Sequence, residues 1–177
     1  PESVLNKTGL NHLLTPVEWS TDNKHLVIKH DYDGGSEFVL IDRESADKAV
    51  NLNKHFGIKF SDMPLRDKKF DRYYLHDKDT GDLVDANLDD KKTTQIASKV
   101  LSFQPHGDDI ILYATDLGKS KDNVTVIIKD GNKSYTLREL PKSQKYLLDL
   151  ARFNGKWYIA VGSSEDQRVY IYVDPFN

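Results

Sequence analysis

The sequence predicts an all-β fold made of four-stranded antiparallel meander blades, β-propeller-like, with about four blades in the chain. Three observations predict it: similar stretches recur along the chain, β-rich runs alternate with turn residues, and helical patterning is scarce. The chain has 177 residues, of which 38% are hydrophobic and 30% charged. That length and composition suit a folded chain with a core of its own.

The copies of the repeat follow one another at similar spacing. The first turn of each copy falls near Asn23, Phe70, Gly107 and Gly155, in steps of 47, 37 and 48 residues. These steps average about the length of the four-stranded unit of propeller repeats. We therefore expect a single propeller-like domain over residues 1–177, a fragment of a longer protein because the chain opens at Pro1 without a methionine or signal peptide. The predicted blades are 13–57, 58–98, 99–142 and 143–177.

The predicted strands are rich in β-branched and aromatic residues, and some are apolar on both faces. Runs of that kind fit strands that lie between neighbouring blades. The last blade has no fourth strand in the sequence, so we expect an open edge that invites self-association, or its closure by residues 2–8. The second strands are predicted at 25–30, 72–77, 109–115 and 156–162, the third at 37–42, 123–130 and 168–174, and the fourth at 48–53, 93–98 and 135–140.

One segment, "SADKAVNLNKHFG" (45–57), carries weak helical spacing. Ser45 could cap a helix there and Gly57 could end it. We predict loop and strand with one short helical turn.

The stretch "HDYDGGSEFVLID" (30–42) is interpreted as a hairpin turn, in which Gly34 and Gly35 supply positive φ, as Gly81 does in "DKDTGD". The alternative is a cation-binding loop. A calcium loop needs oxygen ligands at alternate positions and a closing Glu, whereas Gly81 and Leu88 stand at two of those positions. No cofactor is expected, with a calcium ion at an acidic loop as the weaker alternative.

The connections between second and third strands are acidic. Because a propeller places these connections on one rim, their carboxylates could attract a cationic partner or a weakly held metal. Turns are also simply rich in Asp, and Lys78, Lys119 and Lys121 dilute the charge. The candidate binding rim consists of Asp31, Asp33, Glu37, Asp77, Asp79, Asp82, Asp116, Asp122, Glu165 and Asp166.

Other chemistry has little support in the sequence. There is no cysteine, the six histidines lack metal-ligand spacing, and no G-x-S-x-G or phosphate-binding loop occurs. Trp19 and Trp157 are expected in the core, with sugar stacking as the weaker alternative. A net charge of −3 gives no reason to expect nucleic acid, and no apolar run is long enough to span a membrane. We therefore expect no catalytic residues, no metal site and no membrane contact by this fragment.

Long segments resemble the C-terminal β-propeller region of bacterial membrane-anchored PEGA-domain-containing proteins, which is WD40- or TolB-like. The resemblance runs from about Leu13 to Pro175. It implies an extracytoplasmic, cell-surface protein tethered through an anchor that this chain lacks, and it supplies no catalytic residues. The segments are "VEWSTDNKHLVIKHDYDGGSEFVLIDR", "VNLNKHFGIKFSD", "LRDKKFDRYYLHDKDTGDL", "VLSFQPHGDDIILYATD" and "LRELPKSQKYLLDLARFNGKWYIAVGSSEDQRVYIYVDP".

Two functions follow as hypotheses. The first is a non-catalytic interaction module of the bacterial cell envelope, binding a protein or a cell-wall glycan through a propeller face. The alternative is a propeller hydrolase or lyase with carboxylates gathered from several blades, since such pairs leave no local signature in a sequence.

Overall fold

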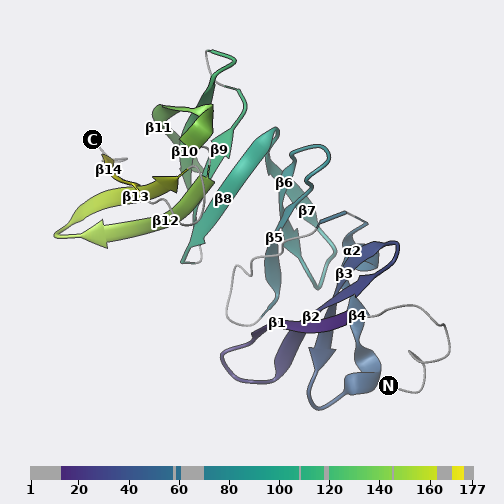
Figure 1. Ribbon diagram of the computed structural model, residues 1–177. Coiled ribbons are helices and arrows are strands. Elements are labelled where there is room, and N and C mark those ends of the chain that lie inside the picture. The colour runs from purple at the N-terminus through teal and green to yellow at the C-terminus, as the bar shows by residue number, and fades with distance from the viewer. Residues whose placement is uncertain are drawn as a thin grey trace. The chain divides into compact units, whose positions relative to one another are not determined.

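The computed structural model describes residues 13–57, 59–60, 70–107, 109–117, 120–144, 146–162 and 169–173. Within these ranges the strands form four antiparallel sheets, and each sheet is a meander of strands consecutive in sequence (Figure 1). The all-β fold class predicted from the sequence is confirmed. None of the helices in the described ranges is long and apolar enough to cross a membrane.

The first sheet has the order β1-β2-β3-β4, and a short helix follows it. The side chain of Asn51 accepts a hydrogen bond from the Lys54 N–H and so caps helix α2 (Leu52–Phe56), which ends at Gly57 with φ of 67°. Gly57 is confirmed as the stop, whereas Ser45 lies at the N-cap position of the 3-10 turn that begins at Ala46, without a capping bond from its side chain, and does not cap α2. The other elements are β1 (Leu13–Trp19), β2 (His25–Tyr32), β3 (Gly35–Asp42), the 3-10 turn η1 (Ala46–Lys48) and β4 (Val50–Asn51).

The other three sheets repeat the same up-and-down order. The N-terminal segment 2–8, expected as a possible closing strand, lies outside the described residues. The second sheet contains β5 (Arg72–His76), β6 (Leu83–Asn87) and β7 (Thr93–Ala97). The third sheet contains β8 (Val100–His106), β9 (Ile110–Thr115), β10 (Asn123–Asp130) and β11 (Lys133–Pro141). The 3-10 turn η2 (Lys142–Gln144) leads to the fourth sheet. This sheet contains β12 (Tyr146–Phe153), β13 (Lys156–Gly162) and β14 (Val169–Val173).

The four first turns share a backbone conformation. Asn23, Phe70, Gly107 and Gly155 all have left-handed φ, at 55°, 66°, 64° and 76°. Gly and Asn adopt this region readily, but Phe70 does so against the preference of a bulky side chain. Its ring is only 2% exposed, so burial offsets the strain of the backbone. The turn spacing found in the sequence is therefore a structural repeat.

The chain divides into two compact units, each described by itself below. Unit 1 is Pro1–Asp77 with Val84–Thr94, and unit 2 is Lys78–Leu83 with Gln95–Asn177. The expectation of a single domain over 1–177 stays a prediction.

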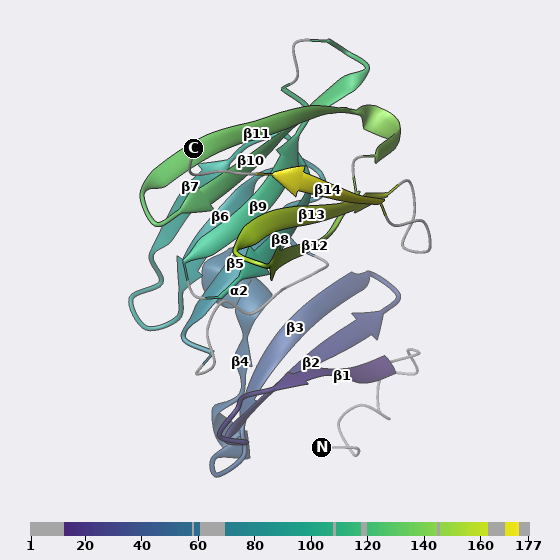
Figure 2. The ribbon, with the colours of Figure 1, turned by 90° about the vertical axis from the view of Figure 1, so that its left-hand side faces the viewer.

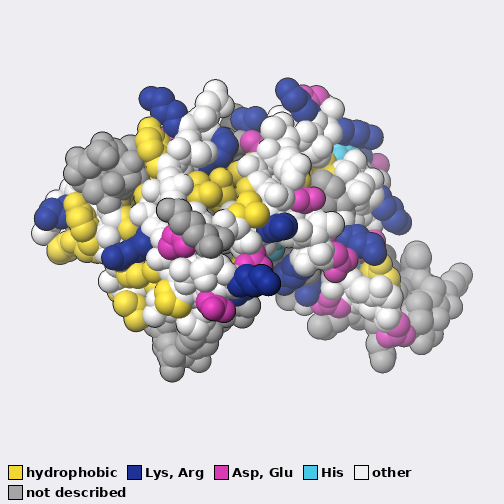
Figure 3. Space-filling view, turned by 90° about the horizontal axis from the view of Figure 1, so that it is seen from above, with side chains coloured by type: hydrophobic (Ala, Val, Ile, Leu, Met, Phe, Trp, Pro, Cys, Tyr) yellow, Lys and Arg dark blue, Asp and Glu magenta, His cyan; other side chains and the backbone are white. Residues whose placement is uncertain are grey.

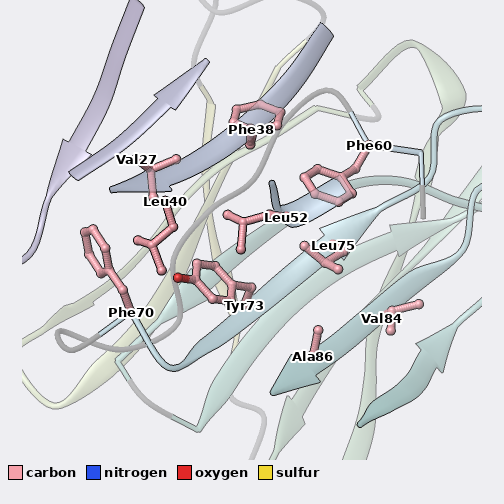
Figure 4. Close-up of a cluster of buried hydrophobic side chains, with 10 residues drawn as sticks. All are labelled: Val27, Phe38, Leu40, Leu52, Phe60, Phe70, Tyr73, Leu75, Val84 and Ala86. Atoms are coloured by element: carbon pink, nitrogen blue, oxygen red, sulfur yellow. The ribbon is translucent and has the colours of Figure 1, made fainter. Parts of the chain in front are cut away.

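Each unit has its own hydrophobic cluster. In unit 1, the rings of Phe38 and Phe60 stack with centroids 5.5 Å apart, and the Phe38 N–H donates to Asn53 Oδ1 at 2.7 Å, which ties β3 to α2. Figure 4 shows the members of this cluster pointing toward one another: Val27, Phe38, Leu40, Leu52, Phe60, Phe70, Tyr73, Leu75, Val84 and Ala86. The cluster of unit 2 comprises Leu112, Ala114, Val124, Val126, Ile128, Leu140, Leu150, Ile159, Val161 and Val173.

Candidate functional site

The hairpin between β2 and β3 holds three of the predicted rim acids. Asp31 accepts a hydrogen bond from the Ser36 hydroxyl, and Lys29 Nζ lies 3.2 Å from its Oδ1. The bond from Ser36, with that from Lys29, lowers the pKa of Asp31 below its ordinary value. Asp33 lies in the exposed turn itself. Asp31 is thus held by its own hairpin.

The two glycines of this hairpin have different roles. Gly35 has a positive φ of 142°, as expected. Gly34 lies outside the left-handed region, so the prediction that it supplies positive φ is wrong. A Cβ on Gly34 would lie 2.9 Å from Cε2 of Tyr32, so a glycine at this position leaves room for the tyrosine ring.

Glu37 is held in a small polar network on the first sheet. Asn51 Nδ2 donates to Glu37 Oε2 at 2.6 Å, and His30 Nδ1 lies 3.3 Å from Oε1. Partial burial raises the pKa of Glu37, but the hydrogen bonds from Asn51 and His30 outweigh it, so the pKa lies below its ordinary value.

This network predicts a pH dependence of stability. A carboxyl whose pKa is lower in the folded chain than in the unfolded chain stabilises the folded state. This contribution is fully present at pH values above the unfolded pKa of about 4.5, and it is lost as the pH falls through the folded pKa. In the wild type, the urea concentration at the unfolding midpoint should therefore fall as the pH is lowered from neutral to below about 4. We expect Glu37→Gln to make this fall smaller. Glu18→Gln, at an exposed position of β1, is the matched control and should keep the wild-type pH dependence. Identical profiles for both variants would contradict the assignment.

The turns of unit 2 hold further predicted rim acids, and lysines lie among them. Lys142 Nζ pairs with Asp116 Oδ1 at 2.6 Å, and the Lys142 N–H donates to the Asp122 carbonyl at 2.7 Å. Gln95 Nε2 donates to Asp82 Oδ1 at 3.0 Å. Side-chain partners therefore hold the carboxylates of Asp116 and Asp82, whereas Asp122 is bonded through its backbone carbonyl. Asp77 is half-buried and Asp79 is exposed, whereas Glu165 and Asp166 lie outside the described residues.

Two of these turns meet. The Val100 N–H donates to the Gly81 carbonyl at 2.7 Å, and the Asp116 N–H donates to the Lys99 carbonyl at 2.9 Å. The turn that holds Asp82 thus lies next to Asp116, with Lys99 between them. The rim shared by all four turns stays a prediction. In the described part of the chain, no group of three or more His, Asp or Glu side chains could hold a metal ion.

A different feature stands out on the fourth sheet. In β13 and β14, Ile159, Val161 and Val173 point into the cluster of unit 2. The alternate residues lie on the opposite face. Tyr158 and Tyr172 are direct cross-strand partners there, with ring centroids 5.6 Å apart.

Aromatic side chains continue across this face. Tyr172, Tyr170 and Phe153 are 48%, 56% and 66% exposed. Lys156 Nζ lies 5.5 Å from the ring centroid of Tyr172, close enough for a cation–π contact. We call Phe153, Lys156, Tyr158, Tyr170 and Tyr172 the tyrosine face. β12, β13 and β14 lie at the left of Figure 1, and hydrophobic side chains reach the surface at the left of Figure 3.

The tyrosine face ends at the edge of its sheet. The strand order is β12-β13-β14, so β14 has one paired side among the described strands (Figure 2). An edge strand with exposed aromatic residues offers both backbone groups and ring surface to a partner.

Sequence reasoning missed this face because "VYIYV" (169–173) reads as apolar on both sides. The available signal was the alternation of Tyr170 and Tyr172 with branched residues, since tyrosine carries a polar hydroxyl and tolerates a wet surface.

The two tryptophans, both expected in the core, differ in the structure. Trp157 packs against the cluster of unit 2 as expected. The expectation for Trp19 is wrong: a bulge between Pro16 and Glu18 places it opposite Leu26, on the face away from the core, where it is 48% exposed.

Meanders of antiparallel strands repeated in this way define a β-propeller-like chain. No family model and no curated protein matches the sequence. Among solved structures, the chain is similar to the N-terminal domain of Nup159, with 12% identity and a TM-score of 0.50 over 89% of this chain and 42% of that one. It is also similar to a chain of the S. cerevisiae complex of Dbp5 bound to Nup159 and Gle1, with 13% identity and a TM-score of 0.46 over 82% and 40%.

The chain thus spans about two fifths of the length of these structures. At 12% identity, the likeness to the Nup159 domain supports a propeller-like fold and nothing finer.

Proposed function

We propose that this chain is a non-catalytic protein-interaction module of a bacterial cell-envelope protein, located outside the cytoplasm, and that it binds a protein through the tyrosine face. The cell-envelope part rests on the resemblance to the propeller region of PEGA-domain-containing proteins. The binding part rests on one observation, the exposed aromatic surface on the fourth sheet.

Tyrosine suits such a surface. Its ring offers a large contact area with few rotatable bonds, so little conformational entropy is lost on binding, and its hydroxyl can bond to a polar partner. Tyr170 and Tyr172 lie two residues apart on one strand, and Tyr172 packs against Tyr158. The contact with Tyr158 holds the Tyr172 ring in place before a partner arrives, which lowers the cost of binding.

Two of the predicted rim acids lack the electrostatics of a general acid. A general acid at neutral pH needs a carboxyl whose pKa is raised. The pKa values of Asp31 and Glu37 are both lowered, by the bonds from Ser36 and from Asn51 and His30. These two carboxylates therefore stay ionised at neutral pH, which fits a structural role in the hairpin.

We expect the double substitution Tyr170→Ala with Tyr172→Ala to reduce partner binding by at least about tenfold, because central aromatic residues carry a large share of interface energy. Leu117→Ala, at an exposed position between β9 and β10, is the matched control and should bind like wild type. The measurement is an affinity pull-down from solubilised bacterial envelope proteins, quantified by mass spectrometry for the three immobilised chains.

A set of proteins retained equally by wild type and the double variant would contradict the assignment of the face. Co-sedimentation with purified cell-wall glycan serves as the second arm. Aromatic rings also stack on sugars. If glycan binding depends on Tyr170 and Tyr172, and if the double variant retains the same proteins as wild type, the partner of the tyrosine face is a glycan and not a protein.

A further inference from the structure

The first sheet carries a second partly exposed apolar face. In β2 and β3, Val27, Phe38 and Leu40 point into the core of unit 1, so the alternate residues lie on the opposite side. Most of these alternate residues are apolar, with His30 and Glu37 as the polar members, and three large side chains on this side, Leu14, Trp19 and Tyr32, are 47%, 48% and 37% exposed. We call Leu14, Trp19, Leu26, Ile28, Tyr32, Val39 and Ile41 the tryptophan face.

A sheet with water on one side alternates apolar and polar residues, whereas a sheet between two layers is apolar on both sides. The first sheet follows the second pattern at its centre, because Leu26 and Ile28 face away from the core that contains Val27. On the fourth sheet, the side away from the core carries the rings of Tyr158, Tyr170 and Tyr172. In a propeller, neighbouring blades cover such faces. Each of the two faces therefore offers apolar ring surface to a second sheet.

We propose that the tyrosine face of one copy of this chain packs on the tryptophan face of a second copy. This inference rests on the proposed function, because it names the partner of the tyrosine face. Sheet-on-sheet packing of this kind is head to tail, so it gives a dimer when it closes and a longer assembly when it does not.

Charge favours this pairing over tyrosine face on tyrosine face. Lys156 lies over Tyr172 on the tyrosine face. Glu37 is the cross-strand partner of His30, so it lies on the same side of the first sheet as the tryptophan face, and its lowered pKa keeps it ionised. Head-to-tail pairing brings a cationic face to an anionic one, whereas two tyrosine faces would bring the two copies of Lys156 together.

The large exposed side chains supply part of the contact area. Six of them on the two faces, each about half exposed, would bury roughly 600 Å² in one contact, since a buried aromatic side chain contributes 150–250 Å². That is about half of the 1,200 Å² lower limit of a specific, stable interface, so this pairing is expected to associate weakly.

The test is sedimentation velocity on the whole chain over a wide range of micromolar concentrations. The tyrosine-face variant is Tyr170→Glu with Tyr172→Glu, the tryptophan-face variant is Trp19→Glu, and Leu117→Glu is the control on neither face. We expect wild type and the control to associate as concentration rises, and each face variant alone to remain monomeric, because a buried unpaired carboxylate opposes packing.

Mixing the two face variants decides the mode of pairing. The tyrosine-face variant keeps an intact tryptophan face, and the tryptophan-face variant keeps an intact tyrosine face, so a mixture should form a heterodimer through one intact contact. Restored association in the mixture also shows that both variants are folded. A monomeric wild type, or a mixture that stays monomeric, would overturn the inference. If wild type is monomeric but Tyr170 and Tyr172 still govern the pull-down, the second copy is excluded and the proposed function stands.

Discussion

Leu52→Ala should lower the free energy of unfolding by about 3 to 4 kcal/mol, within the range found for fully buried leucines replaced by alanine. Leu52 is the first residue of α2, and its side chain is 0% exposed inside the cluster of unit 1. Alanine favours a helix at least as well as leucine does, so the loss comes from the cavity and the lost apolar contact and not from α2 itself.

The measurement is urea unfolding followed by circular dichroism, with Leu117→Ala as the matched control. Leu117 is 56% exposed, so the same chemical change there should alter stability by less than about 0.5 kcal/mol. Equal effects at the two leucines would mean that the core of unit 1 is not built around α2.

Gly81→Ala should also destabilise the chain, by about 2 to 4 kcal/mol from two additive causes. Gly81 has a left-handed φ of 76°, a backbone conformation that costs conformational free energy for any residue with a Cβ. A Cβ there would also lie 2.8 Å from the Cα of Lys99, and backbone atoms cannot move aside as a flexible side chain can. The Gly81 carbonyl accepts from the Val100 N–H, so a shift would loosen the junction with β8.

Gly107→Ala separates the two causes. Gly107 has a similar φ of 64°, but nothing lies within 4 Å of its would-be Cβ. This variant should therefore lose only the conformational part, about 1 kcal/mol. Urea midpoints of the two variants give the comparison, and a Gly81 variant no less stable than the Gly107 variant would contradict the close approach of Lys99.

The architecture was accessible from the sequence because local chemistry repeats with the blade. Asn23, Gly107 and Gly155 are residue types that adopt left-handed turns, so their spacing carries the repeat. The β-branched runs between such turns then specify strands. Even Phe70, an uncommon residue for that backbone, was located, because the segment around it resembles the other copies of the repeat.

The candidate site was less accessible. Exposure of Trp19 depends on the bulge after Pro16, which changes the face on which later residues lie and leaves no trace in composition. The tyrosine face is visible only when the register of β13 and β14 is known, because Tyr158 and Tyr172 are 14 positions apart in the chain. The rim acids were easy to find in the sequence, but their lysine, serine and asparagine partners appear only in the fold.

Hydroxyl-radical footprinting of the tyrosines by mass spectrometry tests the central claim most directly. It compares the isolated chain with the chain bound to the partner recovered in the pull-down, or with itself at high concentration if that partner is a second copy. The account predicts that Tyr170 and Tyr172 lose reactivity on binding while Tyr135, on β11, keeps its own. Unchanged reactivity at Tyr170 and Tyr172 in a bound complex would contradict the claim that the tyrosine face is the binding surface.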